Sequence, residues 1–231
     1  MLVISAALVQ PAHAGDKKGG KGQAKATTTA PAPTQTDANT PVAGCSPTTS
    51  SGHKPMKFAI PTYKAPQSTM TFTFKTNCGD IVVQADGKNA PVTVFILAVM
   101  AKVGYYDKSI CHRLTTSLMY VLQCGDPTAT GQGGPNFRFD DENLPTNVPN
   151  NYPAGTVAMA NSGLQPNGRG TNGSQILYVY GDTTLPPNYT RWGTITQGLD
   201  ILKAVAARGA TGKIGDGKPK QTIAIESVSV K

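Results

Sequence analysis

Few residues in this chain could carry out acid–base, nucleophilic or metal chemistry. Of its three histidines, His13 and His53 lie in segments that lack the composition of a folded domain. A site built from several histidines is therefore excluded. A Ser–His–acid triad would depend on His112 alone, and the chain has no G-x-S-x-G turn to present such a serine. The three consecutive acids at 140–142 could bind a divalent cation, but adjacent carboxylates are more typical of a solvated turn.

Glycine and cysteine motifs give no site either. The glycine-dense run at 131–134 is not followed by a helical pattern, so it is not a phosphate-binding loop. The cysteines contain no C-x-x-C, which argues against a zinc knuckle or thioredoxin-like chemistry. They are Cys45, Cys78, Cys111 and Cys124. In an exported chain we expect them to form disulfides. Three pairings are open, and Cys111 with Cys124 is the first expectation because both lie on successive short strands.

The informative residues form six short blocks in a fixed order between residues 111 and 175. They are C-H-R-L-T-T, Y-V-L-Q-C-G-D-P, T-G-Q-G-G-P, F-D-D-E-N, G-T-V-A-M-A-N and T-N-G-S-Q. These blocks resemble the cyclophilin family of peptidyl-prolyl cis–trans isomerases over roughly residues 69–231. The first two blocks are most similar to exported cyclophilins of actinobacteria. The resemblance implies a mainly β fold, namely a closed eight-stranded antiparallel barrel capped by two α-helices.

The resemblance also implies the site residues. Arg113, Gln123 and Asn161 would be catalytic. Arg113 would donate to the prolyl nitrogen in the twisted state of the X–Pro bond, and this differential binding would lower a barrier of about 18–20 kcal/mol. Gln123 and the Asn161 backbone would hold the substrate's amides. The substrate-binding residues would be Tyr120, Val121, Ala160, Gln175, Leu177, Leu185 and Tyr189. No metal and no cofactor are implied.

Some positions depart from the family's pattern. The family commonly has Phe where this chain has Leu177, and an aromatic wall holds a proline ring better than an aliphatic one does. Two extra residues lie within the stretch 115–119 and about five lie at roughly 164–168, and the second insertion borders the pocket for the residue preceding the proline pair. We therefore expect an altered substrate range. The family's cyclosporin-contacting Trp aligns near Thr184, so cyclosporin should bind weakly at most.

The elements that must position these residues are mostly strands. Short β-rich runs separated by turn residues predict strands at 70–75, 80–85, 109–114, 119–124, 156–161, 174–180, 191–196 and 222–230. Proline and glycine boundaries with apolar periodicity predict helices at 91–103 and 198–208. Many strands with two helices indicate one closed β domain over residues 67–231.

The segment before that domain has a different composition. Residues 1–14 resemble the end of a secretory signal with an A-x-A cleavage pattern, although no positively charged segment precedes it. Residues 15–66 have few large apolar side chains, so we expect a disordered tether. This tether carries more than half of the chain's net charge of +8. Its only aromatic residues, Phe58 and Tyr63, lie near its end and do not alternate with the lysines at 17–25, so specific nucleic-acid binding is not expected.

We therefore predict a monomeric prolyl isomerase acting on Pro-containing client polypeptides. It would be exported, either extracellular or associated with the cell envelope, with an N-terminal anchor if the start is truncated. The alternative is a non-catalytic cyclophilin-fold module that binds Pro-containing peptides, which Leu177 and the 164–168 insertion favour. A third hypothesis is binding to polyanions or the cell envelope through the Lys-rich tether.

Overall fold

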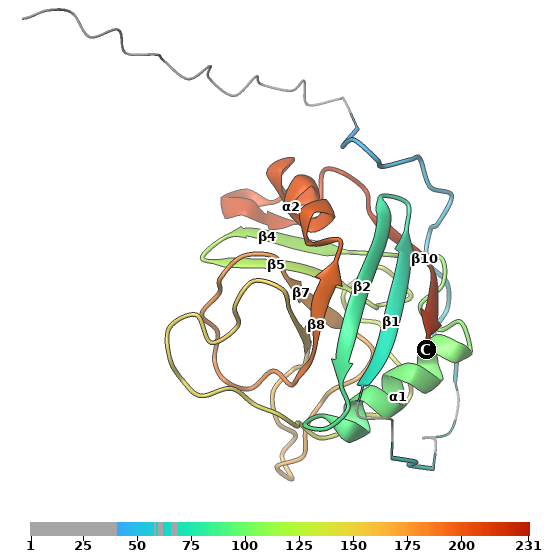
Figure 1. Ribbon diagram of the computed structural model, residues 1–231, viewed down its shortest axis with the longest axis vertical. Coiled ribbons are helices and arrows are strands. Elements are labelled where there is room, and N and C mark those ends of the chain that lie inside the picture. The colour runs from blue at the N-terminus through green and yellow to red at the C-terminus, as the bar shows by residue number, and fades with distance from the viewer. Residues whose placement is uncertain (1–40, 58, 60–61, 66–68) are drawn as a thin grey trace, which may run out of the picture. The chain divides into compact units, whose positions relative to one another are not determined.

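The computed structural model describes residues 41–57, 59, 62–65 and 69–231. The predicted signal remnant at 1–14 and the tether up to residue 40 lie outside these residues. The described chain forms ten strands, two α-helices and one 3-10 helix (Figure 1). The strands are β1 (Thr69–Thr76), β2 (Gly79–Asp86), β3 (Ser109–Ile110), β4 (Arg113–Ser117), β5 (Met119–Cys124), β6 (Thr156–Met159), β7 (Ile176–Val179), β8 (Arg191–Gln197), β9 (Asp216–Gly217) and β10 (Ala224–Val230). The helices are α1 (Pro91–Lys102), α2 (Leu199–Ala207) and the 3-10 turn η1 (Lys213–Gly215). Neither α-helix has the length and apolarity needed to span a bilayer, as far as the described residues go.

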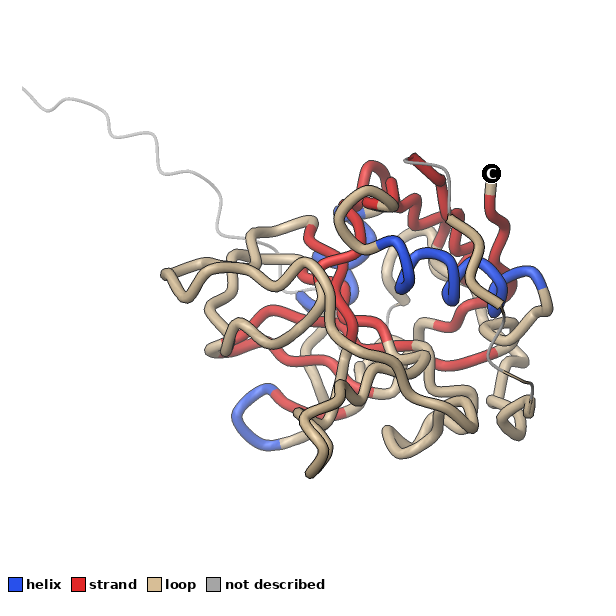
Figure 2. The backbone as a smooth tube through the Cα atoms, turned by 90° about the horizontal axis from the view of Figure 1, so that it is seen from below, coloured by secondary structure: helices blue, strands red, loops and turns tan. Residues whose placement is uncertain are grey.

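The strands form one antiparallel sheet in the order β3–β10–β1–β2–β8–β6–β7–β5–β4–β9. The prediction of a closed eight-stranded barrel is therefore wrong. The sheet is a curled half-barrel of ten strands, and among the described residues its two end strands, β3 and β9, do not pair with each other. In the orthogonal view of Figure 2 the strands curve around one another rather than lying flat.

The reason for the opening lies between β3 and β4, which sequence patterning merges into one strand. Cys111 donates its backbone N–H to the carbonyl of Ile223 (3.0 Å), whereas the N–H of His112 bonds the carbonyl of Gln123 (3.1 Å). The chain thus changes its pairing partner within two residues, from the β10 side to β5. This change interrupts the hydrogen-bonded ladder that a closed barrel would need.

Aromatic rings from three strands make the centre of the main core. Phe72 and Trp192 lie edge to face with ring centroids 5.3 Å apart, and Phe74 meets Tyr178 in the same way at 5.6 Å. All four side chains are fully or almost fully buried. Burial of each of these side chains stabilises the fold by about 1.5–3 kcal/mol. Because Tyr178 is the neighbour of Leu177, this packing also fixes the strand that carries a predicted site residue.

The N-terminus of α1 is capped by a residue from a distant loop. Ala90 at the N-cap supplies no side-chain bond. The carboxylate of Glu142 instead accepts the backbone N–H of Val92 (3.1 Å) and of Thr93 (2.8 Å), together with the Thr93 hydroxyl (2.8 Å). A carboxylate at this end of a helix satisfies free N–H groups and complements the helix dipole.

The two other acids of this cluster also have internal partners. Asp140 pairs with Arg169, and Asp141 accepts the side-chain amide of Asn172 (2.8 Å). The expectation of a solvated turn therefore holds only for Asp140, whose side chain is 55% exposed, whereas Asp141 and Glu142 have structural roles. No group of acids, histidines or cysteines that could hold a metal ion occurs among the described residues.

The segment before β1 is fastened to the domain where residues 41–57 are described. Two disulfides are present, Cys45–Cys78 and Cys111–Cys124, which confirms the first expected pairing. The backbone N–H groups of Ser46 and His53 bond the carbonyls of Asn77 (2.8 Å) and Pro127 (2.7 Å). Sequence analysis placed this stretch in a disordered tether. Its composition offers little apolar burial, but a disulfide and backbone hydrogen bonds hold it instead.

Candidate active site

The β4–β5 hairpin and β7 bring the predicted residues onto one face of the sheet. Arg113 lies opposite Gln123 in the β4–β5 pair, and Gln123 lies opposite Leu177 in the β5–β7 pair. Leu177 in turn lies opposite Ala158 on β6. Because directly opposed residues in an antiparallel pair point to the same side, these side chains form one continuous surface.

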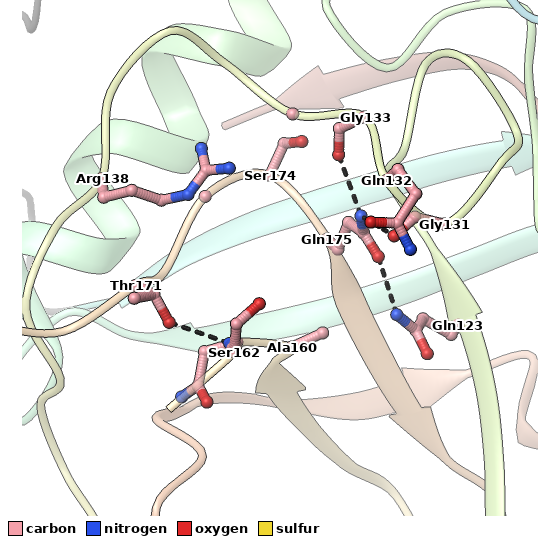
Figure 3. Close-up of a pocket in the computed structure, with 13 residues that line it drawn as sticks. Gln123, Gly131, Gln132, Gly133, Arg138, Ala160, Ser162, Thr171, Ser174 and Gln175 are labelled. Atoms are coloured by element: carbon pink, nitrogen blue, oxygen red, sulfur yellow. Dashed lines mark hydrogen bonds between the residues drawn. The ribbon is translucent and has the colours of Figure 1, made fainter. Parts of the chain in front are cut away.

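A chain of hydrogen bonds fixes the guanidinium of Arg113 in this surface. Arg113 donates from one terminal nitrogen to Oε1 of Gln123 (3.3 Å), and Gln123 donates to Oε1 of Gln175 (2.7 Å). Gln175 donates to the carbonyls of Gly131 (3.1 Å) and Gly133 (2.9 Å). Figure 3 shows the last part of this chain. Each amide has its donor and acceptor ends fixed by its neighbours, so the whole row is oriented in one direction.

Asp216 holds the other edge of the same guanidinium. Its two carboxylate oxygens accept Nε and the second terminal nitrogen of Arg113, each at 2.8 Å. This hydrogen-bonded carboxylate raises the pKa of Arg113, and Arg113 lowers the pKa of Asp216. Arg113 is therefore charged throughout the range in which proteins fold. Two of its five N–H groups remain available to a ligand, since Asp216 and Gln123 use three.

The apolar part of the site is a small cluster separate from the main core. It contains the buried residues Val121, Tyr152, Ala158, Leu177 and Val179, with Ala160, Leu185 and Tyr189 packed against it. Five of the seven predicted substrate-binding residues lie here, and a sixth, Gln175, belongs to the row of hydrogen-bonded amides. Tyr120 lies in neither group, because it follows the strand alternation onto the face of Leu122, where its ring lies 6.0 Å from that of Tyr180.

A polar pocket of about 210 Å³ lies beside Gln123. Ala160, Asn161 and Gln175 line it together with glycines of the 131–134 loop (Figure 3). The side chain of Asn161 is engaged by two other loops, since it donates to the carbonyl of Asn188 (2.7 Å) and to the carboxylate of Asp141 (3.3 Å). Its backbone N–H and C=O make no hydrogen bond to any described residue. They are therefore free to pair with the backbone of a bound chain.

Asp126 shapes the loop that ends this hydrogen-bond chain, and its structural role was not predicted. The side chain is fully buried and accepts the backbone N–H of Thr128 (2.7 Å), Thr130 (3.0 Å), Gly131 (2.6 Å) and Gly133 (3.0 Å). Burial raises the pKa of Asp126, but these hydrogen bonds outweigh burial and the net pKa is lowered. The carboxylate thus holds the carbonyls of the 131–133 turn in place for Gln175.

His112 should make stability pH-dependent. It is buried, and neither ring nitrogen has a hydrogen-bond partner among the described residues. Burial lowers its pKa, as does Arg113, against an opposing effect of Asp126. An unfolded histidine titrates near pH 6.5, so below this pH the unfolded chain binds a proton that the folded one does not. We expect the unfolding free energy to fall, by at most about 1.4 kcal/mol per pH unit, until the lowered pKa is reached.

Urea unfolding between pH 5 and 8 measures this effect. The matched variant His112→Phe keeps a ring of similar shape without a titrating group, and its unfolding free energy should vary less over this range. An equal slope in the parent and the variant would contradict the assignment to His112.

Comparisons with known proteins point to the same family as the sequence blocks do. The family model for cyclophilin type peptidyl-prolyl cis-trans isomerase/CLD matches residues 69–230. A probable peptidyl-prolyl cis-trans isomerase B of Mycobacterium leprae is 42% identical over 172 residues, covering 70% of this chain and 57% of the relative. Its Mycobacterium tuberculosis counterpart is 44% identical over 165 residues, covering 66% and 52%. This chain thus spans about half the length of these relatives.

Other relatives are covered almost completely. Peptidyl-prolyl cis-trans isomerase A of Mycobacterium tuberculosis is 32% identical over 182 residues, which are 72% of this chain and 94% of that protein. A crystal structure of a Cryptosporidium parvum cyclophilin superposes with a TM-score of 0.59 at 26% identity, covering 71% of this chain and 98% of that one. A second structure of that protein, in the presence of the dipeptide Ala-Pro, gives 0.58 at 25% identity over 70% and 98%. The chain therefore belongs to the cyclophilin-type peptidyl-prolyl cis–trans isomerase family.

Proposed function

We propose that this chain catalyses cis–trans isomerisation of X–Pro peptide bonds in client polypeptides. The observation that carries the proposal is the fixed guanidinium of Arg113, which shares a strand pair with the apolar cluster around Val121 and Leu177. The apolar cluster would hold the proline ring. The free N–H groups of Arg113 would lie beside it.

Rotation about the X–Pro bond breaks no σ bond, so the chemistry asks for stabilisation of a twisted amide. In the twisted state the prolyl nitrogen regains its lone pair and becomes an acceptor, and Arg113 would donate to it only then. Gln123 would hold Arg113 and a substrate amide, with Gln175 fixing Gln123. The Asn161 backbone would pair with the client backbone before the proline, beside Ala160. Leu185 and Tyr189 would close the proline pocket, and Tyr120, on the opposite face of its strand, would add no contact to the proline ring.

The test is an exchange NMR measurement on a capped Ala-Ala-Pro-Ala peptide, since this method needs no auxiliary protease. We expect the folded chain to accelerate the exchange between the cis and trans peptide signals in proportion to its concentration. Absence of acceleration by a folded chain would overturn the proposal.

A non-catalytic peptide-binding module is the second candidate. The observation that favours it is Leu177, which is 6% exposed and gives an aliphatic wall where the resemblance implies an aromatic one. In the same NMR experiment such a module would shift peptide signals on binding without increasing their exchange.

Export of the protein is also part of this proposal. The two disulfides support it, because such bonds form and persist in oxidising compartments. The clients would then be exported chains that contain proline, and the protein would act on them as a monomer.

Cyclosporin is expected to bind weakly. Thr184, which aligns near the family's cyclosporin-contacting Trp, is exposed and offers no ring for an apolar contact. Calorimetric titration should give a dissociation constant above about 0.1 µM, and a tighter value would contradict this expectation.

A further inference from the structure

Two large apolar side chains beside the site are mostly exposed to solvent. Leu118, at the tip of the β4–β5 hairpin, is 89% exposed, and Ile214, in the η1 turn, is 83% exposed. They face a groove of about 510 Å³ that Met119 and Leu185 also line, here called the 118/214 groove. Leu118 lies within the stretch 115–119, which holds two extra residues and to which the proposed function gives no role.

The backbone at both positions is unfavourable for these residue types. Leu118 has φ +64° and Ile214 has φ +57°. Positive φ is uncommon for any residue other than glycine, and for a β-branched residue such as Ile214 it is an outlier. Glycine or asparagine would adopt this backbone with little strain. Local backbone conformation therefore does not account for the apolar side chains, and strain of this kind persists mainly at functional sites.

The two sides of the groove are fastened to each other. The Ser117 hydroxyl donates to the carbonyl of Ile214 (2.5 Å), and the Thr116 hydroxyl donates to that of Gly215 (3.3 Å). Strands β4 and β9 pair just behind, with Thr115 opposite Asp216. Leu118 and Ile214 are thus held as a pair on bonded segments, and a preformed groove binds with a smaller entropy loss than a mobile one.

The groove is continuous with the catalytic surface. Leu185 lines the groove and also packs on the apolar cluster, and Asp216 at the groove's edge binds Arg113. Asp216 and Gln123 accept hydrogen bonds from opposite edges of the Arg113 guanidinium. The groove therefore lies on one flank of Arg113, and the polar pocket beside Gln123 and Asn161 lies on the other.

We propose that the 118/214 groove binds an apolar side chain of the client in the segment that follows the proline. This inference rests on the proposed function, in which the residues before the proline occupy the polar flank at Asn161. The following residues then cross the opposite flank, where Leu118, Met119, Leu185 and Ile214 present apolar surface. The groove would make the chain selective for clients with Leu, Ile, Met or Phe shortly after the proline.

The test compares capped peptides that differ only in the place of one leucine. The reference is Ala-Ala-Ala-Pro-Ala-Ala-Ala, and in the other peptides leucine replaces one alanine after or before the proline. The full chain and its Leu118→Gly/Ile214→Gly variant are assayed by exchange NMR. We expect the parent's kcat/KM to be about 5–10-fold higher for the best peptide with leucine after the proline, as partial burial of a leucine side chain allows.

In the double variant this preference should fall to about one, with the all-alanine rate unchanged. Glycine relieves the positive φ at both positions, so the variant's thermal midpoint should not fall far below the parent's. Leu118→Met should retain the preference. Val103→Ala removes part of an exposed apolar side chain at the end of α1 and should change nothing.

Four results would overturn the inference: no preference in the parent, a preference only for leucine before the proline, a preference that survives in the double variant, or self-association that the double substitution abolishes. The last result would identify a second copy of the chain as the occupant. If no peptide is isomerised, the proposed function fails. The same peptides titrated against the labelled protein then test the groove by the ratio of their affinities.

Discussion

Replacing Arg113 by Ala is expected to lower kcat/KM for X–Pro isomerisation by about 10²–10³-fold, the usual cost of removing one preorganised donor at a reacting centre. The fold should tolerate the change. The Arg113–Asp216 pair is partly exposed, with side chains 38% and 47% accessible, and exposed ion pairs contribute little to stability. Exchange NMR gives the rate and circular dichroism confirms the fold.

Arg113→Lys separates charge from geometry. A lysine keeps the positive charge, but it cannot span Asp216 and Gln123 with a planar fork, so we expect it to remain at least about tenfold less active than the parent. Lys108→Ala is the matched control, because it removes another partly exposed cation paired with a carboxylate, Glu226. A fully active Arg113→Ala variant would exclude Arg113 as the donor.

The largest expected effect on stability comes from Asp126→Ala. Four backbone N–H groups lose their acceptor, and hydrogen bonds to a charged group contribute about 1.5–3 kcal/mol each. We expect the unfolding free energy at pH 7 to fall by about 3 kcal/mol or more, as measured by urea unfolding. Activity should fall as well, because the carbonyls of Gly131 and Gly133 position Gln175.

The pH dependence gives a second measure of Asp126. Its folded pKa lies below the ordinary 3.8, so its stabilising effect is complete above that value and is lost as the pH falls through the folded pKa. The difference between parent and variant should therefore shrink below about pH 4. Asp140→Ala removes an exposed carboxylate paired with Arg169 and should change stability by less than about 1 kcal/mol. Equal effects of the two substitutions would argue against the role of Asp126.

Local patterns predict much of this fold because its strands are marked by alternation and turn residues. Residues 119–124 form a strand with the predicted bounds, and both helices begin and end within one residue of prediction. The predicted strand 109–114 divides into β3 and β4 because Cys111 and His112 bond different neighbours. The strand that pairs with β3 lies more than a hundred residues further along the chain, so no local sequence pattern predicts this pairing.

The candidate site, like the fold, could be predicted only in part from the sequence. Arg113, Gln123 and Gln175 could be proposed from the sequence because they lie in recognisable blocks, and in the structure they are joined by hydrogen bonds. Asp216 was missed because it lies 103 residues after Arg113 in a stretch without a motif. The groove at Leu118 and Ile214 was not predicted, because no periodic pattern in the sequence around either residue indicates that its side chain is exposed.

The Cys45–Cys78 bond has a consequence for how the chain can be cut. Every peptide bond between residues 45 and 78 lies inside a covalent ring. One protease cut there opens the ring without separating the pieces, so the N-terminal portion stays attached to the domain through Cys78, just before β2. Such a nicked protein should migrate as one band on a non-reducing gel and as two after thiol treatment. Separation of the N-terminal portion from the domain therefore requires a cut before Cys45, or reduction as well as a cut.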